Sequence, residues 1–275
     1  MTTRRDFLAA TGAASLWGAG ELLGASAANE LPRPLQNGIV EGTGDYLMTP
    51  GLVYLNTGST GPSTKAVLER TITAWRQLET NPVKQAYSDD GLLDSAEKVR
   101  EQAAAFLGCS SEELLITRST GEAMNTVAQS LRVNPGDRVL STDQEHGGGT
   151  DCWKYLVERR MVVLDTVAIT RDMDDRAIVS AIAGGIRNGT KVVSVSHVLW
   201  TTGRRMPVGE IAALARERNI LCVVDGAQAV GAVPVNVKAL GCHAYAATGA
   251  QVAAGAQRSR AALHRRAIPK SARNT

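Results

Sequence analysis

From residue 63 onward, the order of apolar and polar positions predicts helices and strands that alternate along the chain. Apolar residues recur at helical spacing, which predicts helices over 63–79, 92–108, 121–131, 150–160, 175–186 and 208–219. Short apolar runs between them predict strands over 113–118, 138–142, 161–169, 191–198, 220–225 and 243–249.

This alternation predicts an α/β fold. Short buried strands joined by amphipathic helices are typical of a mostly parallel sheet with helices on both faces. Ligands of such sheets bind at the carboxyl ends of the strands, so the polar residues that end each strand are the candidates for chemistry. No internal repeat and no low-complexity linker precedes residue 250.

Composition excludes several classes of function. The chain of 275 residues is 44% hydrophobic and 21% charged, the balance of a globular protein with a core. Its net charge of +3 is too small to indicate nucleic-acid binding, and no apolar run after residue 30 is long enough to span a membrane. The four cysteines lack Cys-x-x-Cys spacing, so we expect no metal site, while a disulfide stays open.

The first 27 residues resemble a twin-arginine (Tat) signal peptide. Arg4 and Arg5 precede a weakly apolar run rich in Ala and Gly, and a small-x-small cleavage pattern ends at Ala27. The alternative is a flexible N-terminus with two chance arginines. We expect residues 1–27 to direct the protein to the Tat export machinery, and hence to the periplasm or the exterior.

Polar residues follow several of the predicted strands. Thr120 and Gly121 lie between a strand and a helix, where backbone N–H groups can bind an anion or the residues can serve as an ordinary cap. His146 precedes three glycines that allow close backbone approach, and it too can simply cap a helix. Asp225 ends a fully apolar strand, with Gln228 three residues on. A carboxylate there is costly unless it meets a cation or strong donors, or caps the next helix.

Together these segments resemble the pyridoxal-phosphate (PLP) enzymes of aminotransferase class V, which include cysteine desulfurases and isopenicillin N epimerase-like proteins. The resemblance covers about residues 50–249, through YLNTGSTGPS, TRSTGEAMN, EHGGG, SHVLWTTGRRMPVGEI and VVDGAQAVGAVPVNVKALGCHAYAATG in the family's order. It implies the large domain of a type I PLP-dependent transferase, with the C-terminal small domain missing. It also implies an amino-acid substrate and a homodimer.

The resemblance implies roles for the residues around the cofactor ring. Asp225 would pair with the protonated pyridine nitrogen, and Gln228 would donate a hydrogen bond to the phenolic oxygen. His146 would stack on the ring and assist proton transfer.

Other matched positions would hold the phosphate and the substrate. Thr120, the Gly121 backbone and Thr248 would bind the phosphate, and Asn56 lies on the substrate side. Gly121 departs from the family, which usually has Thr there. Trp200 stands where the desulfurases have Asn, which favours the epimerase-like branch over a desulfurase-like lyase.

The family's catalytic lysine is absent. In the family a Thr-Gly pair is followed by His and then by the lysine that binds the cofactor covalently, and here Gln251 stands at that position. Gln has no basic amine, so it can neither form that bond nor move the substrate's α-proton. Lys238 lies on a preceding segment and Lys270 far along the tail, so neither replaces it.

The pattern ends at Gly249. Residues 250–275 contain six Lys or Arg, no Asp or Glu, and few large apolar residues. A coding sequence for the family's Gly-His-Lys-Trp continuation, with one extra G after the glycine codon, can be translated as residues 249–258 of this chain. We interpret 250–275 as an out-of-frame, disordered tail and 28–249 as an incomplete PLP-type large domain. The alternative is a natural pseudoenzyme with a substituted lysine.

Two classes of function stay open. The first is a PLP enzyme of the epimerase or aminotransferase type, inactive as written. The second is a non-enzymatic protein of the PLP fold that binds a ligand or partner. A dinucleotide-binding protein is disfavoured because no Gly-x-Gly-x-x-Gly follows the first strand.

The signal peptide predicts that export depends on its arginine pair. Replacing both Arg4 and Arg5 with lysine should keep a fused reporter inside the cell, because the twin-arginine pair is the address that the export machinery reads. Unchanged export of the double variant, measured by cell fractionation, would contradict the assignment.

The interpretation of the tail predicts a single change of frame. Removing one base after the Gly249 codon should restore Gly-His-Lys-Trp, and the downstream frame should encode the family's small domain. Resequencing the gene checks this directly. A downstream frame without family-like sequence would favour the pseudoenzyme instead.

Overall fold

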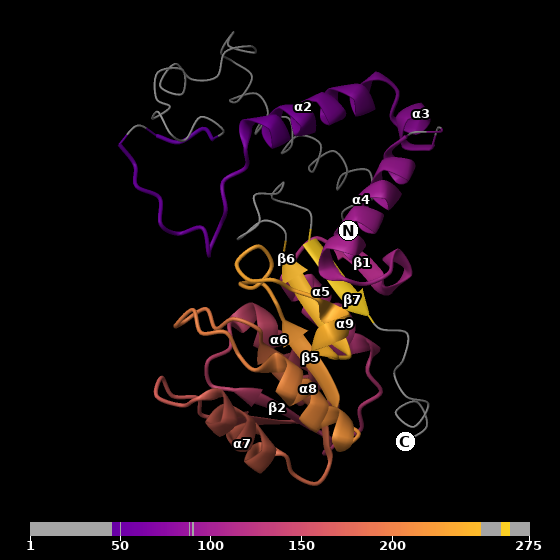
Figure 1. The fold of residues 1–275 in the computed structure, drawn as a ribbon. Coiled ribbons are helices and arrows are strands. Elements are labelled where there is room, and N and C mark those ends of the chain that lie inside the picture. The colour runs from indigo at the N-terminus through magenta and orange to yellow at the C-terminus, as the bar shows by residue number, and fades with distance from the viewer. Residues whose placement is uncertain (1–45, 50, 88, 90, 249–259, 265–275) are drawn as a thin grey trace, which may run out of the picture. The chain divides into compact units, whose positions relative to one another are not determined.

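The computed structural model describes residues 46–49, 51–87, 89, 91–248 and 260–264 (Figure 1). The chain divides into two units, Met1–Val53 and Tyr54–Thr275. Of the first unit only a few residues are described, and there the Leu52 N–H donates to the Thr49 carbonyl at 3.1 Å. The predicted signal peptide lies outside the described residues.

The second unit is built on a seven-stranded sheet with the order β1-β7-β6-β5-β4-β2-β3. Five neighbouring strands, from β6 to β3 in this order, run parallel. The strands are β1 (Leu114–Thr117), β2 (Arg138–Thr142), β3 (Val163–Val167), β4 (Thr190–Ser196), β5 (Leu221–Asp225), β6 (Ala244–Thr248) and β7 (Arg260–His264). The mostly parallel sheet is therefore confirmed.

Helices cover both faces of this sheet. Successive strand residues point to opposite faces, so Val192 packs in one core cluster and Val193 in the other. The cluster of Val192 also contains buried residues of α5 (Thr120–Ser130) and α6 (Gly147–Arg160). The cluster of Val193 contains those of α4 (Leu92–Leu107), α7 (Asp175–Gly185) and α8 (Val208–Glu217).

The remaining elements are short or lie before the sheet. The helix predicted over 63–79 is α2, Lys65–Thr80, and no described residue in it is buried. The pattern did not predict three short helices, α3 (Pro82–Tyr87), η2 (Ser111–Glu113) and α9 (Val237–Leu240). These helices have six, three and four residues, too few to show a helical period.

Two predicted boundaries move for local reasons. The helix predicted from residue 150 begins at Gly147, because the His146 side chain caps it. The strand predicted from residue 161 begins at Val163, because Met161 ends the preceding helix in the left-handed conformation, with φ of 53°.

Five described residues of the segment after Gly249 form a strand. Arg260–His264 forms β7, which runs antiparallel to β6 on one side and to β1 on the other. Backbone N–H and C=O groups make these ladder bonds, so composition alone does not prevent a strand here. These five residues form a strand where disorder was expected, and the rest of the tail lies outside the described residues.

Within the described part of the chain, no helix is both long and apolar enough to cross a membrane. The same residues contain no cluster of three or more His, Cys, Asp or Glu placed to bind a metal ion. No disulfide joins the four cysteines, all of which are described.

Candidate active site

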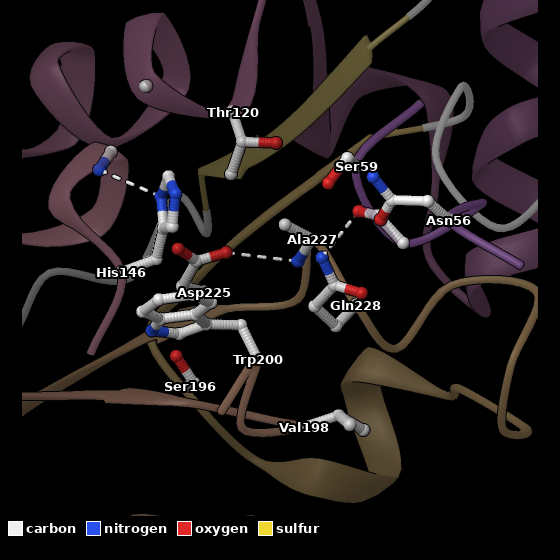
Figure 2. Close-up of a pocket in the computed structure, with 13 residues that line it drawn as sticks. Asn56, Ser59, Thr120, His146, Ser196, Val198, Trp200, Asp225, Ala227 and Gln228 are labelled. Atoms are coloured by element: carbon white, nitrogen blue, oxygen red, sulfur yellow. Dashed lines mark hydrogen bonds between the residues drawn. The ribbon is translucent and has the colours of Figure 1, made fainter. Parts of the chain in front are cut away.

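A cavity of about 530 Å³ lies where the strand ends of the second unit meet the loop that follows Tyr54 (Figure 2). It is lined by Asn56, Gly58, Ser59, Thr120, Gly121, His146, Gly148, Ser196, Val198, Trp200, Asp225, Ala227 and Gln228. The parallel sheet thus brings together six of the residues singled out in the sequence, namely Asn56, Thr120, Gly121, His146, Asp225 and Gln228.

Asp225 is the buried carboxylate of this cavity. It ends β5, whose other residues are all apolar and buried, and it is 6% exposed. Its Oδ1 accepts a hydrogen bond of 2.9 Å from the Ala227 N–H, whereas no described donor binds Oδ2. Burial raises the pKa of the carboxyl, while the hydrogen bond from the Ala227 N–H and the electrostatic influence of His146 lower it. The site therefore presents an oxygen that favours a cationic or N–H partner.

Gly149 leaves the space beside that open oxygen. A Cβ at this position would lie 2.6 Å from Asp225 Oδ2, closer than such atoms approach. Gly147, two residues earlier on α6, has no such contact, since a Cβ there would meet nothing nearer than Asp151 at 3.7 Å. Glycine at 149 is therefore required by the position of the carboxylate.

His146 both caps α6 and lines the cavity. Its Nδ1 accepts a hydrogen bond of 3.0 Å from the Gly148 N–H, which assigns the proton of the neutral ring to Nε2. The ring also meets Trp200 edge-on, with centroids 5.4 Å apart and planes at 86°. The cap and the contact with Trp200 together fix the direction of the imidazole.

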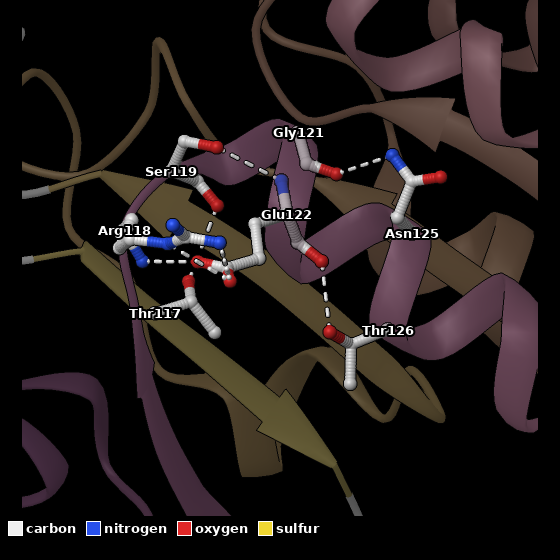
Figure 3. Close-up of polar contacts among 7 residues, drawn as sticks. All are labelled: Thr117, Arg118, Ser119, Gly121, Glu122, Asn125 and Thr126. Atoms are coloured by element: carbon white, nitrogen blue, oxygen red, sulfur yellow. Dashed lines mark hydrogen bonds and ion pairs between the residues drawn. The ribbon is translucent and has the colours of Figure 1, made fainter. Parts of the chain in front are cut away.

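The N-terminus of α5 lies at the cavity wall. Ser119 caps the helix by accepting a hydrogen bond of 2.9 Å from the Glu122 N–H (Figure 3). Arg118 donates to the Glu122 carboxylate through its backbone and its guanidinium, and these bonds lower the pKa of the carboxyl. Thr120 and Gly121 then open the helix with its partial positive charge toward the cavity, which suits an anion.

One predicted site residue, Thr248, is not brought to this wall, and another, Gln251, has no described position. Thr248 ends β6 and is 1% exposed, but it is not among the residues that line the cavity. Its proposed contact with a phosphate stays a prediction. Gln251 lies outside the described residues.

Glu145 and Ser196 are site residues whose contact the sequence did not reveal. Glu145 is half-buried next to the cavity, where it accepts hydrogen bonds from Thr142 at 2.7 Å and from Ser196 at 2.5 Å. Burial raises the pKa of the Glu145 carboxyl, and the two hydroxyls lower it. The signal available in the sequence was that hydroxyl residues, Thr142 and Ser196, end the neighbouring strands β2 and β4.

The sequence also did not reveal the side chains that pack against the turn after Asp225. The Tyr245 ring lies so close to Gly226 that any side chain at 226 would overlap it. The Tyr245 hydroxyl is hydrogen-bonded to His197 Nδ1 at 2.9 Å, and burial lowers the pKa of that histidine to about 4. This neutral, buried pair fixes the turn that follows Asp225.

Comparison with known proteins agrees with this geometry. A family profile described as "Aminotransferase class-V" matches residues 53–256. The chain is 32% identical over 215 residues to isopenicillin N epimerase of Streptomyces clavuligerus, covering 76% of this chain and 52% of that protein. It is 31% identical over 192 residues to a probable cysteine desulfurase of Methanothermobacter thermautotrophicus, covering 69% and 47%. The chain thus spans about half the length of these curated relatives.

Among solved structures, the fold resembles that of a C-DES mutant with glycine covalently linked to its PLP cofactor. The TM-score is 0.74 at 24% identity, and the match covers 78% of this chain and 57% of that chain. The predicted α/β fold of a PLP-dependent large domain is confirmed by this likeness.

The buried Asp225 predicts how stability changes with pH in the absence of a ligand. Its raised pKa means that the folded state keeps a proton that the unfolded state releases from about pH 3.9 upward. The free energy of unfolding should therefore fall as pH rises between the unfolded and the folded pKa. Asp225→Asn should make this fall smaller, leaving the part that Glu145 contributes, and should leave the ligand-free chain more stable than wild type at neutral pH.

Chemical denaturation over a pH series measures this effect. Asp151→Asn is the matched control, because Asp151 is an exposed carboxylate on α6 with 67% of its side chain accessible. It should keep the wild-type dependence on pH. If Asp225→Asn also shows the wild-type dependence on pH, Asp225 is not the buried carboxyl that causes it.

Proposed function

This chain belongs to the aminotransferase class-V family, and on that premise we propose that its cavity binds pyridoxal 5′-phosphate for chemistry on an amino-acid substrate. The observation that carries the proposal is the open Oδ2 of Asp225, a buried carboxylate to which no described cation is bound. A protonated pyridine nitrogen has the charge and the N–H that this oxygen needs.

The donors and acceptors around the cavity fit the cofactor. When bound, PLP supplies an electron-withdrawing ring that stabilises negative charge at the substrate's α-carbon. Asp225 would keep the ring nitrogen protonated, and Gly149 leaves the room that this pairing requires. Gln228, on the turn after β5, would donate to the phenolic oxygen.

The two helix starts at the cavity would hold the other parts of the cofactor. Thr120 and the Gly121 N–H at the start of α5 suit the phosphate. His146 at the start of α6 is held by its cap with Nε2–H as its donor, so it would lie on the ring and move a proton near the substrate. With Gly at 121, the phosphate has one hydroxyl fewer than in most of the family.

The described residues that line the cavity include no lysine. Gln251 stands at the position of the family's lysine and supplies no amine, so the chain as written would hold PLP through non-covalent contacts only. We therefore propose a PLP enzyme that is inactive in this form, with the change of frame after Gly249 as the cause. A non-enzymatic PLP-binding protein is the second candidate, supported by the same substitution.

Trp200 favours the epimerase or aminotransferase type over a desulfurase-like lyase. Its indole lines the cavity and contacts His146, where the desulfurases have an Asn that can donate and accept hydrogen bonds. An aromatic wall gives apolar contact to the substrate instead. Export by the Tat machinery and assembly as a homodimer are further proposals, drawn from the N-terminal sequence and from the family.

The proposal predicts that PLP binds without a covalent bond. PLP should stay with the native chain during gel filtration, yet borohydride treatment followed by denaturation should leave no cofactor on the chain, as read by mass spectrometry. Gly149→Ala should weaken binding about five- to 150-fold, since overpacking of this kind costs about 1–3 kcal/mol. Gly147→Ala, on the same helix turn, should bind as wild type does.

Two results would contradict the account in different ways. A pyridoxyl group fixed on any lysine would show that another amine replaces the missing one. No binding of PLP by wild-type chain that is folded by circular dichroism would overturn the proposed function.

A further inference from the structure

The loop Tyr54–Thr60 forms one wall of the cavity through Asn56, Gly58 and Ser59. The loop closes on itself. The Tyr54 hydroxyl donates to the Thr60 carbonyl at 2.7 Å, and the Asn56 carbonyl accepts from the Ser59 and Thr60 N–H groups at 3.1 and 3.3 Å. It can therefore move as a unit.

Apolar packing does little to hold this loop in place. Leu55, its large aliphatic side chain, is 88% exposed, and Tyr54 is only half-buried. Burial of a side chain like leucine is the usual anchor of a loop, worth about 1.5–3 kcal/mol when complete. The position of this loop at the cavity must therefore depend on polar contacts.

Gln228 supplies such a contact across a long stretch of sequence. Its Nε2 donates to the Gly58 carbonyl at 2.8 Å, as the dashed line in Figure 2 shows. The backbone approaches closely here, since a Cβ at Gly58 would lie 3.1 Å from the Gln228 Oε1. The loop is thus fastened at its middle by a side chain from beyond β5.

Gln228 is itself on a fixed support. The turn that carries it is capped by Asp225, which accepts from the Ala227 N–H, and is closed by the Ala229 N–H donating to the Gly226 carbonyl at 3.0 Å. The carboxylate proposed for the cofactor ring and the amide that holds the loop therefore belong to one turn. A shift of either is transmitted to the other.

We infer that Gln228 is a positioning residue that holds the Tyr54–Thr60 loop against the cavity, so that order in the loop and occupancy by the cofactor are coupled. A glutamine amide has two N–H donors, so one can bind Gly58 while the other serves the phenolic oxygen. The coupling rests on the proposed function, whereas the fastening of the loop does not. Through this coupling, a bound cofactor would position Asn56 and Ser59 on the substrate side of the cavity.

Hydrogen exchange of the loop amides tests the fastening without any ligand. In Gln228→Leu, exchange at Ser59 and Thr60 should be about two- to tenfold faster than in wild type, the range for loss of one hydrogen bond. Gln129→Leu is the matched control, since Gln129 is an exposed amide on α5 and its loss should leave the loop unchanged. Equal loop exchange in wild type and Gln228→Leu would overturn the inference.

Exchange with PLP present tests the coupling. PLP should slow loop exchange in wild type. In Gly58→Ala the added Cβ would lie 3.1 Å from Gln228 Oε1, so the loop and the amide must separate. At PLP concentrations that saturate each protein, the loop of this variant should gain little or no protection. Equal slowing in both proteins would overturn the coupling.

The two proposals fail separately. If PLP does not stay with the folded wild-type chain during gel filtration, the proposed function fails. The ligand-free comparison of Gln228→Leu with wild type then still decides whether Gln228 holds the loop.

Discussion

A carboxylate at the end of an apolar strand is the constraint on which the rest of this site depends. Asp225 loses its hydration in the folded chain, and among the described residues it accepts one hydrogen bond, from the Ala227 N–H. Such a group persists in a fold when a ligand later offsets its cost. The glycine at 149, the turn after β5 and the Tyr245 ring behind it all serve to keep this one oxygen open and fixed.

Function and stability therefore oppose each other at this position. The ligand-free chain keeps a desolvated acid that a neutral amide would replace without loss of shape, whereas a cationic ring would turn the same acid into a favourable ion pair. Glu145, a half-buried carboxylate next to the cavity, instead accepts hydrogen bonds from two hydroxyls of the protein. Glu145 therefore supports the cavity wall, whereas Asp225 has an oxygen available to a ligand.

The sequence predicted the sheet and much of the cavity because both follow from local pattern. Residues that end parallel strands must meet at one edge, which is why His146, Asp225 and the start of α5 could be grouped in advance. Contacts between side chains from different strand ends could not, since they depend on register and rotamer. The bonds from Ser196 to Glu145 and from Gln228 to Gly58 are of this kind, separated by 51 and 170 positions in sequence.

The protonation state of the ring nitrogen in bound PLP tests the central claim most directly. It can be read by nitrogen NMR with isotope-labelled cofactor over a pH series, in wild type and in Asp225→Asn. If Asp225 pairs with this nitrogen, the wild-type complex keeps the ring protonated at pH values where free PLP has lost the proton, and the variant does not. A ring nitrogen that titrates in both complexes as it does in free PLP would contradict the account.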